Sequence, residues 1–265
     1  MTTSIASADH LTDGWEPTTP DGDSMCRRYV HHWAAQCAAF AAAAGGTVVA
    51  TDSYVVTDYG RASGYFNGAV LLAPPRNWDR LLDELEPLLA GGSGEVLLWS
   101  LWPTPDLRFR GWVLEGHPPL LLRPPAALVP VPAPGTPPVE VRTAADLAAW
   151  DHVAVTGYPL ALDGGALAGP ALLTDPRTTL LLSAEDGPPV SASAHFVAAG
   201  LGSLAFAATL PSARGRGHWS RHARARLRLR PDLWHGGIFS DHSRPLAERL
   251  GFVPIVRLTL WRRAR

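Results

Sequence analysis

The sequence predicts a mixed α/β fold, with largely antiparallel sheets flanked by helices and arranged as two tandem domains. Short apolar runs alternate with longer segments of three- and four-residue periodicity, a pattern that indicates strands alternating with helices. The chain has 265 residues and is 46% hydrophobic, which is enough for two packed units. Seven prolines within residues 124–138 separate two halves of comparable make-up. Because so stiff a segment is typical of an interdomain linker, we expect a linker over residues 124–139.

The first domain, residues 24–123, is predicted to begin with a helix. Residues 1–23 before it are polar and contain Pro and Gly, so we expect them to be disordered. Ser24 can cap the helix, which is expected to end near Gly45. Apolar residues at three- and four-residue steps predict its buried face, formed by Tyr29, Trp33, Cys37 and Phe40 or Ala41.

The rest of the first domain is predicted to form a hairpin, two strands, an amphipathic helix and further β structure. Runs of β-branched and apolar residues predict the strands, and a leucine-rich helical periodicity predicts the helix. The hairpin is expected over residues 47–60, the strands over 68–73 and 95–102, the helix over 77–90 and the further β structure over 111–123.

The second domain, residues 140–265, repeats a comparable order of elements. Thr143 can cap a helix that extends to about Val155, and a hairpin turning at Asp186–Pro189 follows. The common order of elements suggests an internal duplication. Strands are then expected over residues 202–210, 236–240 and 253–261, and helices over 218–230 and 243–250.

Charge is distributed unevenly along the chain. The net charge is −1, and all 23 basic residues are arginine. Residues 1–213 hold 10 arginines and 21 acidic residues, whereas residues 214–265 hold 13 arginines and 3 acidic residues. A fold seldom requires such a division, so the C-terminal excess of positive charge indicates an anion-binding surface.

The sequence Arg-Gly-Arg-Gly at residues 214–217 lies between the expected strand 202–210 and the expected helix 218–230. Free backbone N–H groups at a helix N-terminus bind phosphate, and glycine lets the anion approach the backbone. Together with Leu250-Gly251-Phe252 after a short helix, this strand–turn–helix unit resembles the GCN5-related N-acyltransferase (GNAT) superfamily. The resemblance covers roughly residues 140–265. Residues 45–123 resemble, more loosely, the degenerate first domain of tandem acyltransferases.

The resemblance implies an N-acyltransferase that uses acyl-coenzyme A (acyl-CoA) as donor and the amine of a small molecule as acceptor. In the family the glycine turn holds the pyrophosphate of acyl-CoA, and a backbone N–H of the preceding strand stabilises the tetrahedral oxyanion, here within residues 207–210. The residues that the resemblance assigns to the donor are Ala208, Thr209, Leu210, Arg214, Gly215, Arg216, Gly217, His218 and Trp219.

Two positions depart from the family pattern. Trp219 stands where the family has Gly or Ala, and an indole there would crowd the path of the phosphates. Ala247 stands where the family usually has the tyrosine that protonates the departing thiolate. One interpretation is neutral drift in a working coenzyme A enzyme, since thiolates leave well without help and general-acid assistance contributes only about 10²–10⁴-fold. The other is a donor that is not a thioester.

The arginines of the expected helix 218–230 bear on that choice. Arg221, Arg224 and Arg228 are spaced for one face, opposite the expected buried side. Arg226 and Arg230 are expected in an adjacent row, and the buried side is expected to comprise Trp219, Ala223 and Leu227. At about 1.5 Å per residue, this face would be roughly 20 Å long and would exceed what coenzyme A needs.

Three interpretations of the basic face therefore stay open. It can be a solvated surface, the usual origin of such runs. It can bind tRNA, in which case aminoacyl-tRNA would be the donor of an amide-forming enzyme of secondary metabolism. It can also belong to a protein that binds RNA or an acidic partner without turnover.

Candidates for proton transfer are few. The nearest titratable groups to the expected donor site are His195, on the preceding strand, and Asp241, and the Ser240 hydroxyl can relay a proton. His195 can equally be a hydrogen-bonded core residue, and Asp241 can cap the helix from Ser243. Tyr158 is expected to shape the acceptor pocket or to be a turn residue.

Other functional classes lack support in the sequence. His218 and His222 have metal-ligand spacing, but no carboxylate or cysteine completes a set, so we expect no metal. Cys26 and Cys37 are expected on one helix, too few for a disulfide scaffold. Without a signal-peptide pattern or a run of membrane-spanning length, a soluble cytoplasmic protein is expected. The oligomeric state stays open.

Overall fold

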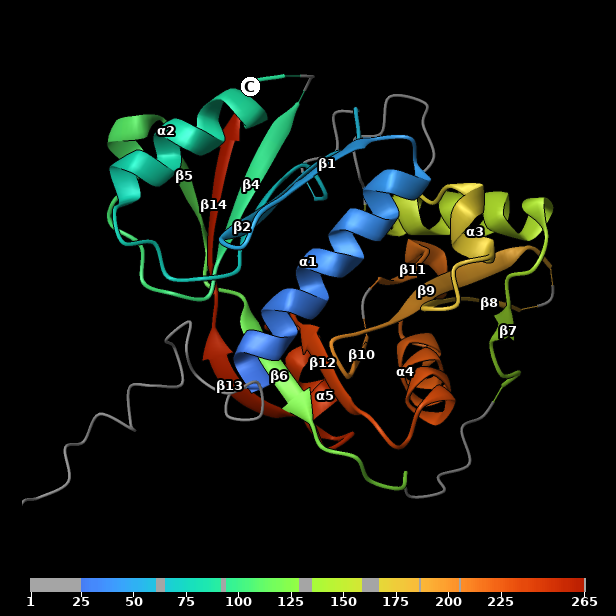
Figure 1. Ribbon diagram of the computed structural model, residues 1–265. Coiled ribbons are helices and arrows are strands. Elements are labelled where there is room, and N and C mark those ends of the chain that lie inside the picture. Colours follow the sequence, from blue (N-terminus) through green and yellow to red (C-terminus); the bar gives the residue numbers. More distant parts are fainter. Residues whose placement is uncertain are drawn as a thin grey trace, which may run out of the picture.

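The computed structural model describes residues 25–60, 65–91, 94–128, 135–158, 167–185, 187–204 and 206–264. Two sheets flanked by helices form two lobes, which confirms the mixed α/β fold class (Figure 1). The expected disordered segment 1–23, the linker residues 129–134 and the expected turn residue Asp186 lie outside the described residues.

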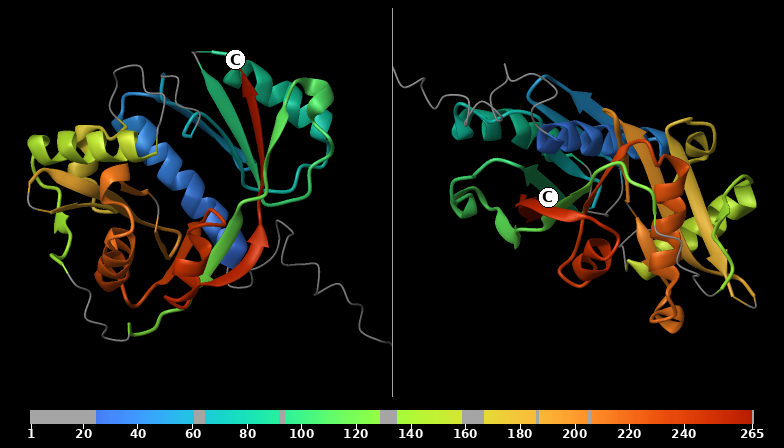
Figure 2. Two further views of the ribbon diagram at one scale, coloured as in Figure 1. Left: turned by 180° about the vertical axis from the view of Figure 1, so that it is seen from behind. Right: turned by 90° about the horizontal axis from the view of Figure 1, so that it is seen from below.

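Helix α1 (Met25–Ala43) lies between the two lobes (Figures 1 and 2). The predicted apolar stripe is buried, including Trp33 and Phe40, and both cysteines lie on this helix with free thiols. The helix contacts β2 (Tyr54–Asp58) on one side and β9 (Pro189–Ala198) on the other. One helix therefore supplies a shared core to both sheets.

The first sheet has the strand order β1-β2-β3-β4-β14-β5. Strands β3 and β4 are parallel, and helix α2 connects them, as a parallel pair requires. A short 3₁₀ turn, η3 (Arg108–Arg110), precedes β5. The other bounds are β1 (Thr47–Ala50), β3 (Gly68–Leu71), α2 (Trp78–Leu89), β4 (Glu95–Ser100), β5 (Val113–Gly116) and β14 (Thr259–Ala264).

The second sheet has the strand order β13-β6-β12-β10-β9-β8-β7, and β11 pairs with β9 alone. Strands β10 and β12 are parallel and are connected by helix α4. Helix α3 begins at the predicted cap: Thr143 and Asp146 form a capping box. The bounds of the strands are β6 (Pro119–Arg123), β7 (Val139–Glu140), β8 (Thr178–Ala184), β10 (Leu201–Ser203), β11 (Ala207–Thr209), β12 (Trp234–Ile238) and β13 (Val253–Arg257). Those of the helices are α3 (Ala144–Gly157), η4 (Pro170–Leu173), η5 (Pro211–Ala213), α4 (His218–Leu229) and α5 (Arg244–Glu248).

The two halves exchange one strand each. Strand β6 comes from the first half and lies between β12 and β13, whereas β14 comes from the second half and lies between β4 and β5 (Figures 1 and 2). The single strand expected over 253–261 is therefore two strands in different sheets, with Leu258 between them. Strand pairing does not follow the division of the chain at residues 124–139, because periodicity reports burial and not the partner strand.

Candidate functional site

The strand expected over residues 202–210 is divided into β10 and β11. Its second part, β11, leaves β12, so the second sheet opens between them. Strand β10 pairs with β12, and the last bond to it runs from Leu204 N–H to Gly236 O at 3.0 Å. Phe206 then has a left-handed φ of 46°, and β11 continues alongside β9 alone. A non-glycine residue in this region marks a local bend of the backbone. Beyond Leu204 the end of β12 therefore pairs with β6 on one side, and none of the described strands pairs with it on the other.

The backbone of β11 directs two N–H groups away from β9, and one of them lies at this gap. Phe206 O accepts a hydrogen bond from β9 at 3.0 Å, and Leu210 N–H donates one to β9 at 2.9 Å. Because alternate residues of a strand point to opposite sides, Ala208 also faces β9, and the N–H groups of Ala207 and Thr209 point away from it. Ala207 lines the gap and its N–H donates to the Tyr158 hydroxyl, whereas Thr209 N lies close to Gly157 at the end of α3. Of the strand residues expected at the donor, Ala208 and Leu210 thus direct their N–H groups away from the gap.

A cavity of about 370 Å³ occupies the gap. We call it the β11–β12 cavity. Ala207, Ile238 and Ser240 line it from the two diverging strands, and Tyr158 lines it from the end of α3. Trp219, in the first turn of α4, forms a further part of the wall, with its ring centroid 6.4 Å from that of Phe239. The cavity therefore lies beside the N-terminus of α4.

The glycine turn before α4 has the backbone of an anion site. Gly215 and Gly217 have φ values of 79° and 77°, a conformation that glycine adopts without strain. Gly217 is the N-cap of α4, so no side chain caps the helix there. A Cβ on Gly215 would meet no atom within 4 Å, so the turn is open at this point. Backbone N–H groups at such a turn are available to a phosphate.

The two turn arginines are held by other groups. Arg214 donates from Nε to Thr209 O at 3.2 Å and from Nη2 to Gly157 O at 3.1 Å, which ties the turn to β11 and α3. Arg216 forms an ion pair with Glu185, and its other Nη donates to Ser212 O at 3.2 Å. The backbone of the turn is therefore its open anion-binding element.

A buried polar network fastens the start of α4 to the sheet. His218 Nδ1 accepts from Arg221 at 2.9 Å, so Nε2 carries the proton and donates to Glu185 at 3.0 Å. The hydroxyl of Ser183 lies 3.0 Å from His218 Nδ1 and 3.0 Å from His222 Nε2. Burial lowers the pKa of His222 to about 3, so this imidazole stays neutral. The Ser193 hydroxyl ends the network 2.7 Å from His222 Nδ1.

The prediction of a basic face on α4 is wrong for Arg226, in the adjacent row of arginines. Arg226 is fully buried, donating to Ala194 O at 3.1 Å and to His222 O at 3.2 Å, and burial lowers its pKa to about 9. The helix lies on polar groups of the sheet, so a residue that the periodicity placed near the edge of the face turns inward.

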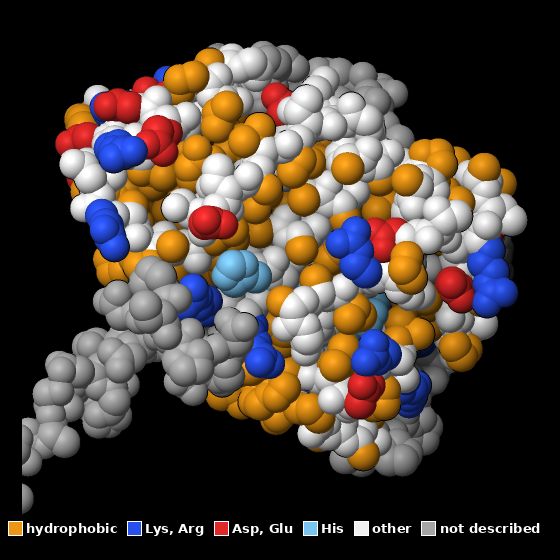
Figure 3. All heavy atoms as spheres, viewed as in Figure 1, with side chains coloured by type: hydrophobic (Ala, Val, Ile, Leu, Met, Phe, Trp, Pro, Cys, Tyr) orange, Lys and Arg blue, Asp and Glu red, His pale blue; other side chains and the backbone are white. Residues whose placement is uncertain are grey.

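The other arginines of α4 do not form a continuous strip either. Arg221 and Arg224 are half-buried, and Arg221 donates to Arg216 O at 2.9 Å. Arg228 and Arg230 are exposed, and Arg230 forms an ion pair with Asp232 at 2.9 Å. On the face of the described residues seen in Figure 3, arginines around α4 lie among acidic and hydrophobic side chains.

The three candidates for proton transfer lie in different places. Ser240 lines the β11–β12 cavity, with its hydroxyl 3.0 Å from that of Ser243. Asp241 is exposed and forms an ion pair with Arg257 at 3.0 Å. His195 is 2% exposed, its Nε2 lies 3.4 Å from that of His235, and burial lowers its pKa to about 3. The structure thus brings Ser240 together with Tyr158 and Trp219, and it places neither Asp241 nor His195 in the described lining of the cavity.

Sequence reasoning missed the contribution of the first half to this cavity. Tyr29 and Trp33 of α1, Tyr65, and Trp99 of β4 all line it. The helical stripe identified the first two as buried, but a core residue and a cavity wall give the same periodicity. The position of Tyr65 and Trp99 depends on how the lobes meet, which has no local signal.

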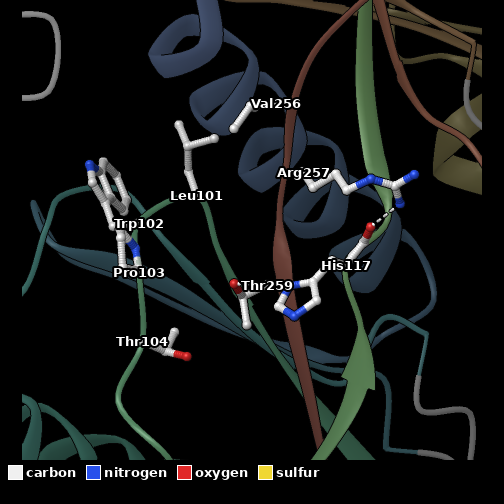
Figure 4. A pocket seen from close by; sticks show the side chains of 8 residues that line it. All are labelled: Leu101, Trp102, Pro103, Thr104, His117, Val256, Arg257 and Thr259. Atoms are coloured by element: carbon white, nitrogen blue, oxygen red, sulfur yellow. Dashed lines mark hydrogen bonds between the residues drawn. The ribbon is translucent and has the colours of Figure 1, made fainter.

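A second pocket, of about 750 Å³, lies where the chain crosses between the sheets. Figure 4 shows Leu101 to Thr104 along one side and His117 and Arg257 along the other. The guanidinium of Arg257 donates to His117 O at 2.7 Å and pairs with Asp241, so its charge is already engaged. No residue of the α4 turn belongs to its described lining. The smaller β11–β12 cavity is therefore the better candidate site.

The described part of the chain contains neither a metal-ligand cluster nor a membrane-spanning helix. No three His, Cys, Asp or Glu side chains among those residues converge as metal ligands. Over the same residues, every helix is too short or too polar to cross a bilayer.

Known proteins similar to this chain are found by comparing structures and not by comparing sequences. No protein-family model matches the sequence, and no curated protein does. A GCN5-related N-acetyltransferase from Kribbella flavida is similar over 87% of this chain and 95% of its own, with 18% identity and a TM-score of 0.59. The chain has the fold of the GCN5-related N-acetyltransferases.

Further solved structures share this N-acetyltransferase fold. A GNAT-family protein from Novosphingobium aromaticivorans matches over 84% of this chain and 95% of its own, with 18% identity and a TM-score of 0.53. A conserved protein of unknown function from Staphylococcus epidermidis matches over 83% and 94%, with 10% identity and a TM-score of 0.58. Each likeness extends over most of both chains, so it is not confined to one sheet.

Proposed function

We propose that the protein transfers an acyl group from an activated carrier, with acyl-CoA as the favoured donor, to the amine of a small molecule. The observation that carries the proposal is the β11–β12 cavity, which opens beside an uncapped glycine turn. Trp219 links the two features, because it belongs to the first turn of α4 and also lines the cavity. The turn would hold the pyrophosphate, and the acyl end would enter the gap.

In the proposed reaction the amine nitrogen attacks the thioester carbonyl carbon. A C–N bond forms, the C–S bond breaks, and its electron pair leaves on the sulfur. The N–H of Ala207 lies at the gap and donates to the Tyr158 hydroxyl, so it can donate to the oxyanion that develops before the bond breaks once that hydroxyl moves aside. The nitrogen gives up one proton, and the thiolate takes up one. Ser240 and Tyr158 carry hydroxyls at the cavity that can relay it, whereas the buried Ala247 on α5 cannot.

The proposal is tested by isothermal titration calorimetry with coenzyme A and two matched glycine variants. Gly217→Ala strains the turn, because alanine disfavours the left-handed conformation, and we expect at least a tenfold loss of coenzyme A affinity. Gly111 has a φ of 79°, close to the 77° of Gly217, and open surroundings, but it follows η3 in the other lobe. Gly111→Ala therefore imposes the same local strain and should leave coenzyme A binding unchanged.

The same titration can contradict the choice of donor. If coenzyme A fails to bind, while aminoacylated tRNA binds with an affinity that falls steeply with salt, the donor is aminoacyl-tRNA instead. Binding of either donor without transfer to any amine would identify a protein that has lost turnover. Release of free thiol from acetyl-CoA in the presence of amines measures turnover directly.

A further inference from the structure

Aromatic rings from both halves of the chain form one wall of the β11–β12 cavity. We define this aromatic wall as Trp33, Tyr65, Trp99, Tyr158 and Phe206. Its rings meet largely edge to face: the centroids of Trp33 and Trp99 lie 5.5 Å apart at 70°, and those of Tyr158 and Phe206 lie 6.0 Å apart at 83°. Such a wall offers both ring faces and ring edges to a ligand, the geometry in which a further aromatic ring is held best.

Three of the five rings of the wall are buried, whereas Tyr65 is half-buried and Tyr158 is 37% exposed. Trp33, Trp99 and Phe206 are each no more than 5% exposed. Phe206 is also stacked on Phe66 with a centroid distance of 4.7 Å, so the shape of the wall is set by core packing. Because packing fixes these three buried rings before any ligand arrives, a flat ligand loses little by binding against them.

The polar groups of the described lining are neutral. They are hydroxyls, indole N–H groups and backbone groups, and no described lining residue carries a charged side chain or an imidazole. An ammonium group would lose its hydration on entering. Any attraction between that cation and the rings would hold the protonated form, which has no lone pair with which to attack a carbonyl.

We propose, on the basis of the proposed acyl transfer, that the acceptor is an aromatic amine. Its ring lies against the aromatic wall, and its nitrogen is uncharged at neutral pH because the lone pair is conjugated with the ring. The nitrogen attacks the thioester carbonyl, the C–N bond forms, and the C–S bond breaks with its electrons on the sulfur. The proton that the nitrogen loses compensates the one that the thiolate gains, so no proton has to be removed from the free acceptor before attack.

The first test compares aniline with cyclohexylamine, using the full-length protein and acetyl-CoA. The two amines have rings of six carbons, but at pH 7 aniline is neutral and flat whereas cyclohexylamine is protonated and puckered. We expect kcat/KM for aniline to be higher by at least tenfold at pH 7. Raising the pH to 9 should increase the rate with cyclohexylamine alone. Equal or faster acetylation of cyclohexylamine at pH 7 would overturn the inference.

The second test changes the wall. We expect Trp99→Leu to raise KM for aniline about five- to tenfold while KM for acetyl-CoA stays constant, and Trp99→Phe to restore most of the loss because a ring remains. Phe109→Leu is the control, since Phe109 is 69% exposed on η3. A uniform change in both KM values, or an equal effect of Phe109→Leu, would contradict a specific role of the wall.

Ligand-observed NMR with aniline and no acetyl-CoA separates this inference from the proposed function. Binding of aniline that is lost in Trp99→Leu, without any acetylation, would support the aromatic ligand and reject acyl transfer. Acetylation of alkylamines without binding of aniline would support acyl transfer and reject the aromatic acceptor. Absence of aniline binding to the unaltered protein would reject the inference in either case.

Discussion

Helices α2 and α4 occupy corresponding places in the two halves, yet their N-termini differ. Each connects a pair of parallel strands, β3 with β4 and β10 with β12. Helix α2 is capped by its own sequence, since Asn77 Oδ1 accepts from Arg80 N–H at 3.0 Å. Helix α4 begins at the left-handed Gly217, which has no side chain to offer. One helix end is therefore satisfied internally, and the other is left for a ligand.

The strands before these helices differ in the same sense. Strand β3 stays beside β4, and a Cβ on Gly68 would lie 1.9 Å from Leu97 O, so nothing can enter between them. Strand β10 leaves β12 after Leu204, and the β11–β12 cavity occupies the space. The same arrangement of two parallel strands and a connecting helix can therefore form either a closed structural unit or an open site. In this protein the closed half supplies walls to the open one.

The attachment of the two helices to their sheets differs as well. The buried face of α2 is formed by leucines, whereas that of α4 includes His218, His222 and Arg226. Apolar packing is insensitive to pH, and buried imidazoles are not. Acid stability is therefore the sharpest way to separate the two halves.

The largest expected effect is a loss of stability in acid. Burial lowers the pKa of His195 and His222 to about 3, and that of His32 and His235 to about 4. Below the unfolded pKa of about 6.5 the unfolded chain binds protons that the folded chain excludes. The free energy of unfolding should thus fall by up to about 1.4 kcal/mol per pH unit for each histidine as the pH drops from 6.5 towards 4.

Urea unfolding at intervals between pH 7.5 and 5 measures this slope. His195→Asn should reduce the slope of the free energy of unfolding against pH by the contribution of one histidine. This holds whatever the variant does to stability at pH 7.5. A free energy of unfolding that is constant from pH 6.5 to pH 5 would contradict neutral, buried histidines on α1 and in the second sheet and its helix α4.

An intermediate effect is expected from the apolar face of α2. Leu82 is fully buried, and Leu82→Ala should lower the free energy of unfolding by about 2–5 kcal/mol through lost contacts and a cavity. The loss should be the same at pH 7.5 and pH 6, and coenzyme A affinity should not change in the folded protein. A pH-dependent loss would mean that the packing of α2, like that of α4, depends on titratable groups.

The smallest effect is expected from the exposed arginines of α4. The double variant Arg228→Ala, Arg230→Ala removes two cations that lie in solvent, one of them paired with Asp232. Surface pairs contribute little, so the midpoint of urea unfolding and the affinity for coenzyme A should stay within experimental error. A clear fall in tRNA affinity in this variant would instead give these arginines a role in binding RNA.

Local signals in the sequence determined the elements of this protein and the backbone of its turn. The stripe of α1, the N-cap at Thr143 and the two glycines before α4 all lie where the sequence predicts them. These features depend on residues within one or two turns of the chain, so the residue pattern contains the information needed.

Tertiary structure alone decided the features that form the cavity. The exchange of β6 and β14, the separation of β11 from β12 and the burial of Arg226 all depend on contacts between residues far apart in sequence. Periodicity marks a side chain as buried but does not say whether it meets a core, a polar network or a ligand. For that reason the turn was predictable from the sequence, and the aromatic wall opposite it was not.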